Sequence, residues 1–254
     1  MPLLASRSAR LASATAAILL AGLTPLALPA AEESVASPDG RIVVTVSDTS
    51  GLHYRVAFDG QPAIVDSRLG LDFAGGVSLG RAAIIESASR ADHDSTWENP
   101  FGQRRTVRDH YRELTVALRE KSAAPSRLNL IVRAYDQGVA LRYEIPTQPG
   151  LEEYTVTQEQ TEFLFPTDLT CWAGNYSECA ENQYPEKRLT QLDTNLGRPH
   201  VLPLLVKLPN GFAVIAESDL LDWAGMFVTA AGPDAQGAPR PGARVALAAR
   251  KDGR

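Results

Sequence analysis

Apolar and polar residues alternate with a period of two along much of the chain from residue 41 onward. Four segments place apolar residues at alternate positions: Ile42, Val44 and Val46; Leu52, Tyr54, Val56 and Phe58; Leu114, Val116 and Leu118; and Leu128, Leu130, Val132 and Ala134. This period is typical of β-strands with one buried face. Asp59-Gly60 and Asp136-Gln137-Gly138 are turn sequences that indicate hairpins. No segment after residue 31 has the pattern of a long amphipathic helix, so the sequence predicts an all-β sandwich.

The segment 229–254 differs in composition from the strands before it. It is rich in Ala, Gly and Pro and has one short apolar run at 245–249. Two interpretations are open, an edge hairpin with a long loop or the start of a linker. We predict one β domain over residues 33–254.

The first 31 residues have the organisation of a secretory signal peptide. Arg7 and Arg10 give a basic start, and residues 11–28 are apolar or small and uncharged. Small residues follow, so we expect cleavage near Ala30 or Ala31. A membrane anchor is the alternative, but the unbroken apolar run is short for a full span. The sequence therefore predicts an exported protein, periplasmic or secreted.

The net charge of the chain limits the classes of partner that it is suited to bind. The 25 basic and 30 acidic residues give a net charge of −5. Removal of the signal peptide takes away Arg7 and Arg10 but no acid, which makes the charge more negative. An acidic domain of this kind is a poor match for nucleic acid or for an anionic membrane surface.

The only two cysteines, Cys171 and Cys179, lie close together in the sequence. In an oxidising compartment a disulfide between them is expected. The alternative is two separate thiols, one of them buried beside Trp172. Their spacing matches no zinc-binding pattern.

The segment "WENPFGQRRTVRDHY", residues 97–111, combines an aromatic residue, turn residues and several arginines. Asn99-Pro100-Phe101-Gly102 has the residue types of a type I turn, so we expect a hairpin here. Trp97 is interpreted as mainly structural, with stacking on a sugar ring as the alternative. The arginines are expected to pair with surface acids.

Common catalytic signatures are missing from the sequence. The four histidines have no HxxxH or HExxH spacing, and no GxSxG, Walker or dinucleotide-binding motif occurs. Carboxylates are plentiful, but spacing alone singles out no acid–base pair. The residues by themselves leave two function classes open, a carbohydrate-binding or lectin-like module and a non-catalytic domain of a larger enzyme.

Six segments form an ordered set along the chain. They are "SPDGRIVVTV" (37–46), "SRLGL" (67–71), "WENPFGQRRTVRDHYRELTV" (97–116), "LNLIVRAYDQGVALRYEIP" (128–146), "TEFLFP" (161–166) and "ESDLLDWAGMFV" (217–228). In their order and spacing they resemble the N-terminal domain of glycoside hydrolase family 97. The resemblance implies a β-super-sandwich of the galactose-mutarotase type.

The resemblance also implies a role. Members of the family are exported bacterial α-glucosidases and α-galactosidases that act on α-linked oligosaccharides. Their catalytic acid and base or nucleophile lie on a (β/α)8 barrel that follows the N-terminal domain. Nothing in this chain alternates strand and helix as a barrel does, so we expect a truncated product or domain fragment without catalytic residues. It would support the barrel and contact carbohydrate; a free-standing carbohydrate-binding module is the alternative.

The family resemblance implies two kinds of site residue. Family members bind calcium near the scissile bond, and the pattern Glu181-Asn182-Gln183-Tyr184 implies that Glu181 is one ligand of a site completed by the barrel. Glu178 and Glu186 are the alternatives, unless all three are solvated loop acids. The loop "GRPHVLP" matches the place where the family's domain touches substrate, which makes His200, Val201 and Leu202 candidate sugar contacts.

Overall fold

The computed structural model describes residues 31–122, 126–178, 181, 183–221 and 223–249. Within these residues the regular elements are β-strands and one 3-10 turn, η1 (Leu189–Gln191). The expected all-β class is therefore confirmed. None of the described residues belongs to a helix with the length and hydropathy needed to cross a membrane. The predicted signal peptide lies outside the described residues apart from Ala31.

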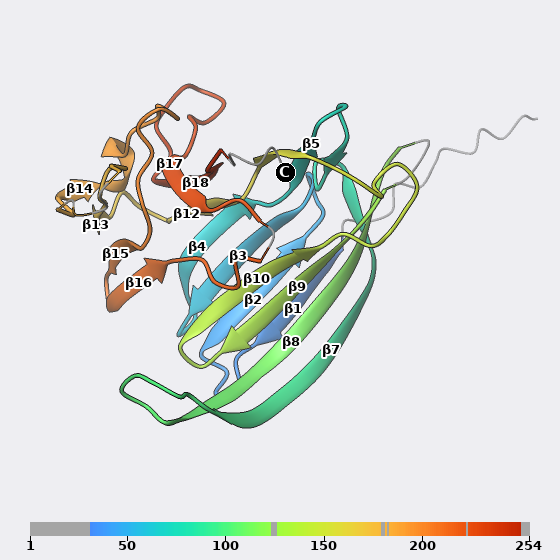
Figure 1. Ribbon diagram of the computed structural model, residues 1–254, viewed down its shortest axis with the longest axis horizontal. Coiled ribbons are helices and arrows are strands. Elements are labelled where there is room, and N and C mark those ends of the chain that lie inside the picture. Colours follow the sequence, from blue (N-terminus) through green and yellow to red (C-terminus); the bar gives the residue numbers. More distant parts are fainter. Residues whose placement is uncertain (1–30, 123–125, 179–180, 182, 222, 250–254) are drawn as a thin grey trace, which may run out of the picture.

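Two four-stranded antiparallel sheets form the larger half of the molecule and lie one over the other (Figure 1). The first has the order β1–β2–β3–β4, with bounds Glu32–Ala36, Ile42–Ser47, His53–Phe58 and Gln61–Arg68. The second contains β7, β8, β9 and β10, in the order β10–β9–β8–β7, with bounds from β7 to β10 of Ala83–Glu98, Thr106–Glu120, Arg127–Tyr135 and Gly138–Glu144. Neighbours in each sheet are consecutive in the chain, as the predicted hairpins require.

The alternating apolar residues of the two sheets meet in a first hydrophobic core. In β2, Ile42, Val44 and Val46 are buried, whereas Val43 and Thr45 between them are only partly buried. The core is completed from β8 and β9 by Leu114, Val116, Leu118, Leu128, Leu130, Val132 and Ala134. Full burial of a large aliphatic side chain stabilises a fold by about 1.5–3 kcal/mol. The alternating apolar residues therefore determine which face of each strand is turned toward the core.

The predicted turn at Asp59-Gly60 is confirmed. Both residues have positive φ angles, 49° and 73°, which is the requirement of a type I′ hairpin turn. Glycine meets it without a Cβ penalty, and aspartate is among the few residues that tolerate it. The Arg41 guanidinium donates two hydrogen bonds of 2.8 Å to the Asp59 carboxylate and fixes the turn on the strand opposite.

Three smaller sheets form the rest of the molecule. The sheet β11–β5–β6 contains Val156–Glu159, Leu71–Phe73 and Ser78–Leu79. The sheet β12–β18–β17 contains Glu162–Leu164, Gly242–Leu247 and Met226–Ala230. The sheet β14–β13–β15–β16 contains Glu186–Arg188, Thr170–Trp172, Leu204–Leu208 and Gly211–Ile215. The sheet β11–β5–β6 packs on the first core, to which it contributes Leu71, Phe73 and Leu79. A second core lies within the other two sheets, which form the smaller half, and includes Phe165, Cys171, Leu189, Leu204, Val206 and Val228.

Strand β12 connects the two halves. It pairs with β18 and also lies against β4 of the first sheet. Ile64 on β4 and Phe163 on β12 pack against both cores. The hydroxyl of Tyr54, a residue buried in the first core, donates a hydrogen bond of 2.9 Å to the carbonyl of Glu162. The two cores are therefore parts of one continuous structure.

The tail of the chain forms a hairpin, as the first interpretation of its sequence predicts. β17 and β18 pair across the connection 231–241. β18 is a central strand, however, because β12 pairs with its other side. A Cβ on Gly242 would overlap the carbonyl oxygen of Phe163, so glycine is what allows the two strands to approach.

Strands β7 and β8 extend beyond the second sheet as a two-stranded arm, residues 94–110 (Figure 1). The pairing of β8 with β9 ends at Tyr111, whereas β7 and β8 stay paired as far as Glu98 and Thr106. Trp97 lies on the arm and is 50% exposed. The prediction that Trp97 is mainly structural, as a core residue, is wrong, because no other described strand pairs with this part of the hairpin.

The tip of the arm is a loop of residues 99–105, closed by a hydrogen bond of 2.7 Å from the Asn99 amide to the Arg105 carbonyl. It is longer than the predicted type I turn. The expected pairing of arginines with acids is confirmed for Arg108, which makes two bonds of 2.7 Å to Asp94. An exposed ion pair of this kind contributes little to stability.

Candidate functional site

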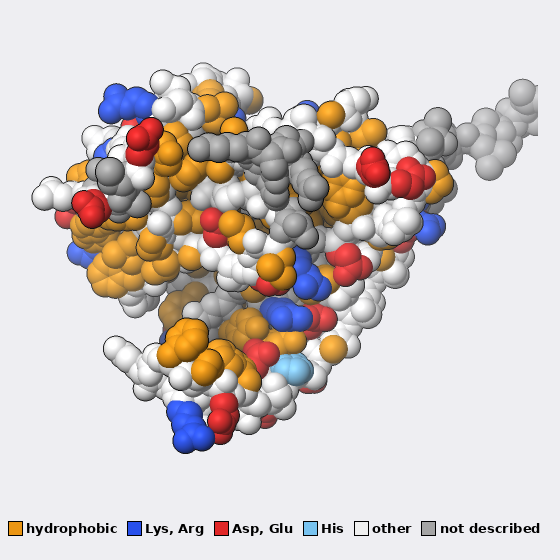
Figure 2. Space-filling model, viewed as in Figure 1, with side chains coloured by type: hydrophobic (Ala, Val, Ile, Leu, Met, Phe, Trp, Pro, Cys, Tyr) orange, Lys and Arg blue, Asp and Glu red, His pale blue; other side chains and the backbone are white. Residues whose placement is uncertain are grey.

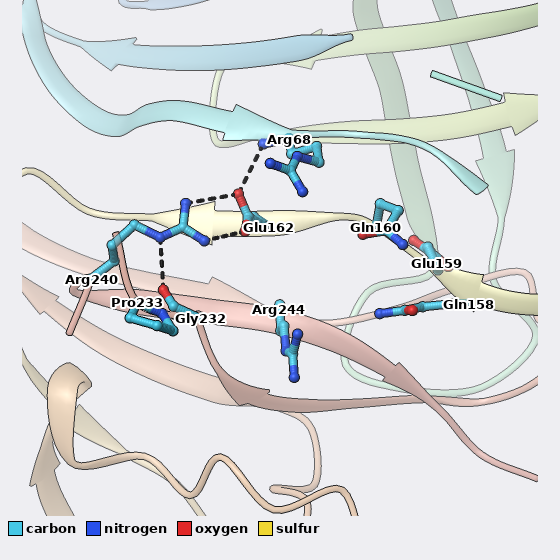
Figure 3. Close-up of a pocket in the computed structure, with 9 residues that line it drawn as sticks. All are labelled: Arg68, Gln158, Glu159, Gln160, Glu162, Gly232, Pro233, Arg240 and Arg244. Carbon is cyan, nitrogen blue, oxygen red and sulfur yellow. Dashed lines mark hydrogen bonds and ion pairs between the residues drawn. The ribbon is translucent and has the colours of Figure 1, made fainter. Parts of the chain in front are cut away.

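A polar pocket of about 230 Å³ opens where the two halves meet (Figure 3). It is lined by Arg68, Gln158, Glu159, Gln160, Glu162, Gly232, Pro233, Arg240 and Arg244. These residues come from β4, from β11 and β12, and from the β17–β18 hairpin. Sequence reasoning missed this pocket, because its segments are far apart in the chain and share no motif.

One wall of the pocket is formed by an ion pair between Glu162, which is buried, and Arg240, which is partly buried. Glu162 is 6% exposed, and Arg240 donates to its two carboxylate oxygens at 2.5 and 3.2 Å. The Nε of Arg240 also donates to the carbonyl of Gly232 at 2.8 Å. The backbone amide of Arg68 makes a longer bond of 3.4 Å to Glu162. The pair therefore ties β4, β12 and the β17–β18 connection together.

A chain of hydrogen bonds ends at the carboxyl group of Glu159, which lines the same pocket. The Gly70 amide donates to the Tyr143 hydroxyl at 2.9 Å, which donates to Thr161 Oγ1 at 2.7 Å. Thr161 in turn donates to Glu159 Oε1 at 2.7 Å, which fixes the direction of the chain. Bonds aligned in this way polarise one another, so the group at the end is held firmly.

The carboxyl group of Glu159 lies in dense surroundings although the residue keeps some exposed surface. Burial is the main cause that raises its pKa, and the nearby Glu217 raises it further. Hydrogen bonds from Thr161 and Trp223 act in the opposite direction but are outweighed. The protonated form is therefore favoured more than for a carboxyl in water.

The segment that holds Glu181 and the loop that holds His200 are neighbours in the smaller half. The Tyr184 hydroxyl donates to the carbonyl of Leu202 at 3.3 Å, and the Tyr184 ring lies against Gly174. The Val201 amide donates to the carbonyl of Gly174 at 2.9 Å. The segment that holds Glu181 therefore packs against the predicted carbohydrate loop, although the two are separate in the sequence.

His200 has a structural role in this loop. It is fully buried, and its backbone exchanges hydrogen bonds of 2.7 and 3.0 Å with Val228. Its Nε2 accepts a hydrogen bond of 3.0 Å from the amide of Asp193. Its Nδ1 has no bond of standard geometry among the described atoms, although the Gly174 carbonyl is near enough to favour a proton there. Burial and then the charge of Lys187 lower the pKa of the ring, so it is neutral at pH 7.

A fully buried imidazole has no surface to offer a sugar. Any contact by this loop must therefore come from its neighbours, and Val201 and Leu202 are both half-buried. The burial of His200 could not be predicted from the sequence, because Gly174 and Asp193 lie beside its ring only in the folded chain. Sugar contact by the loop stays a prediction.

The predicted calcium ligand is accessible. Glu178, Glu181 and Glu186 are all exposed. Within the part of the chain that the structure describes, no three His, Cys, Asp or Glu side chains are arranged to hold a metal. One carboxylate supplies at most two of the six to eight oxygens that calcium prefers, which fits a site shared with another domain. The assignment of Glu181 stays a prediction.

Cys171 is a free cysteine in the structure, as the alternative of separate thiols expects. Cys171 is fully buried in the second core, where burial raises the pKa of its thiol to about 11. Cys179, the expected disulfide partner, lies outside the described residues.

The half that contains the Glu181 segment and the predicted carbohydrate loop also has exposed aromatic side chains. Tyr176 is 51% exposed and packs edge-on against Phe227, with 5.2 Å between ring centroids. Phe212 is 61% exposed and lies 6.0 Å from Trp172. Figure 2 shows hydrophobic side chains gathered over the lobe that carries β15 and β16. Aromatic faces with polar surroundings are suited to stacking on sugar rings.

The chain is similar to known proteins over most of its length. Residues 35–249 match the family model described as "Glycosyl-hydrolase 97 N-terminal". A retaining alpha-galactosidase of Bacteroides thetaiotaomicron is 29% identical over 227 residues, which are 84% of this chain and 33% of that protein. A probable retaining alpha-galactosidase of Streptomyces bingchenggensis is 28% identical over 72% of this chain and 27% of its own length.

Solved structures agree with these matches. A family 97 glycoside hydrolase from Pseudoalteromonas sp., in complex with panose, superposes with a TM-score of 0.74 at 26% identity over 85% of this chain and 32% of that chain. A complex of the Pseudoalteromonas enzyme with acarbose gives the same TM-score, identity and coverage. The chain thus spans about a third of the length of the relatives that it matches.

Proposed function

The chain belongs to the glycosyl-hydrolase 97 N-terminal family, and from this premise we propose that it is the non-catalytic, carbohydrate-contacting domain of an exported α-glycosidase. In that role it supports a catalytic barrel and contacts an α-linked oligosaccharide. The names of its relatives support this substrate class, as do the complexes of the Pseudoalteromonas enzyme with panose and acarbose.

The observation that carries the proposal is the contact between Tyr184 and Leu202. It brings the Glu181 segment, the expected source of a calcium ligand, against the loop expected to touch sugar. A calcium ion at this place would help to orient the substrate, and the chain's own contribution is a single exposed carboxylate. The remaining ligands belong to the partner barrel.

Two measurements on the full chain test the calcium part. Isothermal titration should show calcium binding no tighter than about millimolar, because water fills most of the coordination shell. Glu181→Gln should weaken this binding, whereas Glu178→Gln, a matched change on the same loop, should not. Micromolar binding lost in Glu181→Gln would mean that this domain builds a complete site alone, and equal binding by both variants would remove Glu181 from the site.

A second experiment tests the carbohydrate part. The chain should bind panose weakly, and Leu202→Asp should abolish that binding. Leu196→Asp changes an exposed leucine, 62% accessible, of a nearby loop and serves as the control. The chain should not hydrolyse a nitrophenyl α-glycoside, since the family resemblance places the paired carboxylates that the reaction requires on the barrel. Turnover by the pure chain, or equal panose affinity in both variants, would contradict the proposal.

The exposed aromatic residues favour a second candidate, a free-standing carbohydrate-binding module. Tyr176 and Phe212 would then supply stacking platforms independent of any barrel. Under this alternative, panose affinity would drop in Tyr176→Ala and Phe212→Ala but not in Leu202→Asp. The two candidates therefore give opposite results in one set of titrations.

A further inference from the structure

The polar pocket at the junction has no part in the function proposed above. Among the described residues that line it, Pro233 carries the only apolar side chain and none is aromatic. It therefore lacks the stacking surface that a neutral sugar ring uses. Its character comes from charged and amide groups.

Three arginines line the pocket, but only one is neutralised there. Glu162 and Arg244 are directly opposite each other in the β12–β18 register, so their side chains share one face. The carboxylate of Glu162 is nevertheless taken by Arg240. Arg244 is left with a bond of 3.4 Å to the Thr229 hydroxyl and forms no ion pair with a described residue.

Arg68 lies on the other side of Glu162 and resembles Arg244 in this respect. Its backbone amide reaches that carboxylate, while its guanidinium forms no ion pair within the described part of the chain. Most other arginines that the structure describes do have a carboxylate partner, as Arg41 and Arg133 have. Figure 3 shows Arg68 and Arg244 flanking the Glu162–Arg240 pair along the pocket.

The remaining acid in the lining, Glu159, forms no ion pair with either arginine among the described residues. Its carboxylate ends the hydrogen-bond chain from Thr161, and burial raises its pKa. Two guanidinium groups without an ion pair to a described residue therefore line the pocket, beside the amide of Gln158. An arrangement of this kind matches an anion with several acceptor oxygens.

We propose that the pocket binds a small oxyanion, a carboxylate or phosphate group, with Arg68 and Arg244 as the arginines that attract it. A volume of about 230 Å³ is sufficient for such a group. The guanidinium donors supply parallel charge-assisted hydrogen bonds, which are about twice as strong as neutral ones. The anion is either a free ion or an acidic group carried by a sugar, and the two share this chemistry.

Isothermal titration of the full chain at low ionic strength tests the proposal. Inorganic phosphate and acetate should bind on the order of millimolar, and glucose should not bind. Arg68→Gln and Arg244→Gln should each weaken phosphate binding roughly tenfold, as the loss of a charged hydrogen bond implies. Arg142→Gln removes an exposed positive charge elsewhere and should leave the affinity unchanged.

Glucuronate distinguishes the two sources. Tighter binding than acetate supports an acidic sugar, and equal binding supports a free oxyanion. No phosphate binding by the wild type, or equal loss in all three variants, would overturn the proposal. Circular dichroism and melting curves of the variants exclude misfolding as the cause. Panose binding should be unaffected, so this result is independent of the proposed function.

Discussion

Arg240 holds the buried carboxylate of Glu162 with two hydrogen bonds across the junction of the two halves. Arg240→Met should destabilise the protein by about 3 kcal/mol, because it leaves a buried charge without its partner. Urea unfolding monitored by tryptophan fluorescence measures the change. The double variant Glu162→Leu with Arg240→Met removes both charges and should recover much of the loss. A single variant as stable as the wild type would show that the pair is dispensable.

Trp97 on the arm is expected to contribute little to stability. Because the side chain is 50% exposed, Trp97→Ala should cost less than about 1 kcal/mol, well below the 3–5 kcal/mol of a core tryptophan. Thermal melting measures this, with Leu130→Ala in the first core as the destabilising comparison. A loss for Trp97→Ala as large as that for Leu130→Ala would mean that the arm folds back onto the protein in solution.

Glu159 should make stability depend on pH. Because its pKa in the folded state is raised above 4.5, the folded protein binds this proton more tightly than the unfolded chain does. Its stabilising contribution is therefore complete below pH 4.5 and is lost as pH rises through the raised pKa. Glu159→Gln, which cannot ionise, should gain melting temperature relative to the wild type as pH increases toward neutrality.

A pH series of melting curves measures this effect, with Glu153→Gln as a control at an exposed glutamate of the preceding loop. The difference between Glu159→Gln and the wild type should grow with pH, while that of the control stays flat. A difference independent of pH would place the carboxyl of Glu159 in water.

The structure has Cys171 as a free cysteine, so the disulfide expected between Cys171 and Cys179 needs a direct test in protein produced in an oxidising compartment. Closing so short a loop should stabilise the fold by about 2–3 kcal/mol in the chain-entropy model. Intact mass after alkylation without reduction checks this, and two alkylated cysteines would rule the bridge out. In that case the raised pKa of Cys171 should make its thiol slow to react.

The larger half could be predicted from the sequence because its signals are local. In β2 and in the inner part of β8 every second residue is apolar, and each strand has one buried face. The burial of Val44 and Val116 therefore follows from the pattern alone. The Asp59-Gly60 turn is local in the same sense, because its positive φ angles depend on two residues.

The features that sequence reasoning missed depend on contacts between distant segments. Trp97 is interpreted from the sequence as mainly structural, but its exposure depends on where β9 stops pairing. His200 is a candidate sugar contact in the sequence but is buried, with Gly174 and Asp193 beside its ring. The junction pocket is assembled from residues far apart in the chain, and Glu162 and Arg240 are separated by 78 positions.

That separation has a consequence for the order of folding. The sheets of the larger half are made of consecutive hairpins, which close over short loops and therefore form early. β12 must wait for β18, so in a chain leaving the ribosome the second core stays open until β18 has been synthesised. In pulse-labelling hydrogen exchange, amides of β8 and β9 should gain protection before those of β12. Until then the side of Phe163 that packs on the second core is a hydrophobic surface that a chaperone can bind.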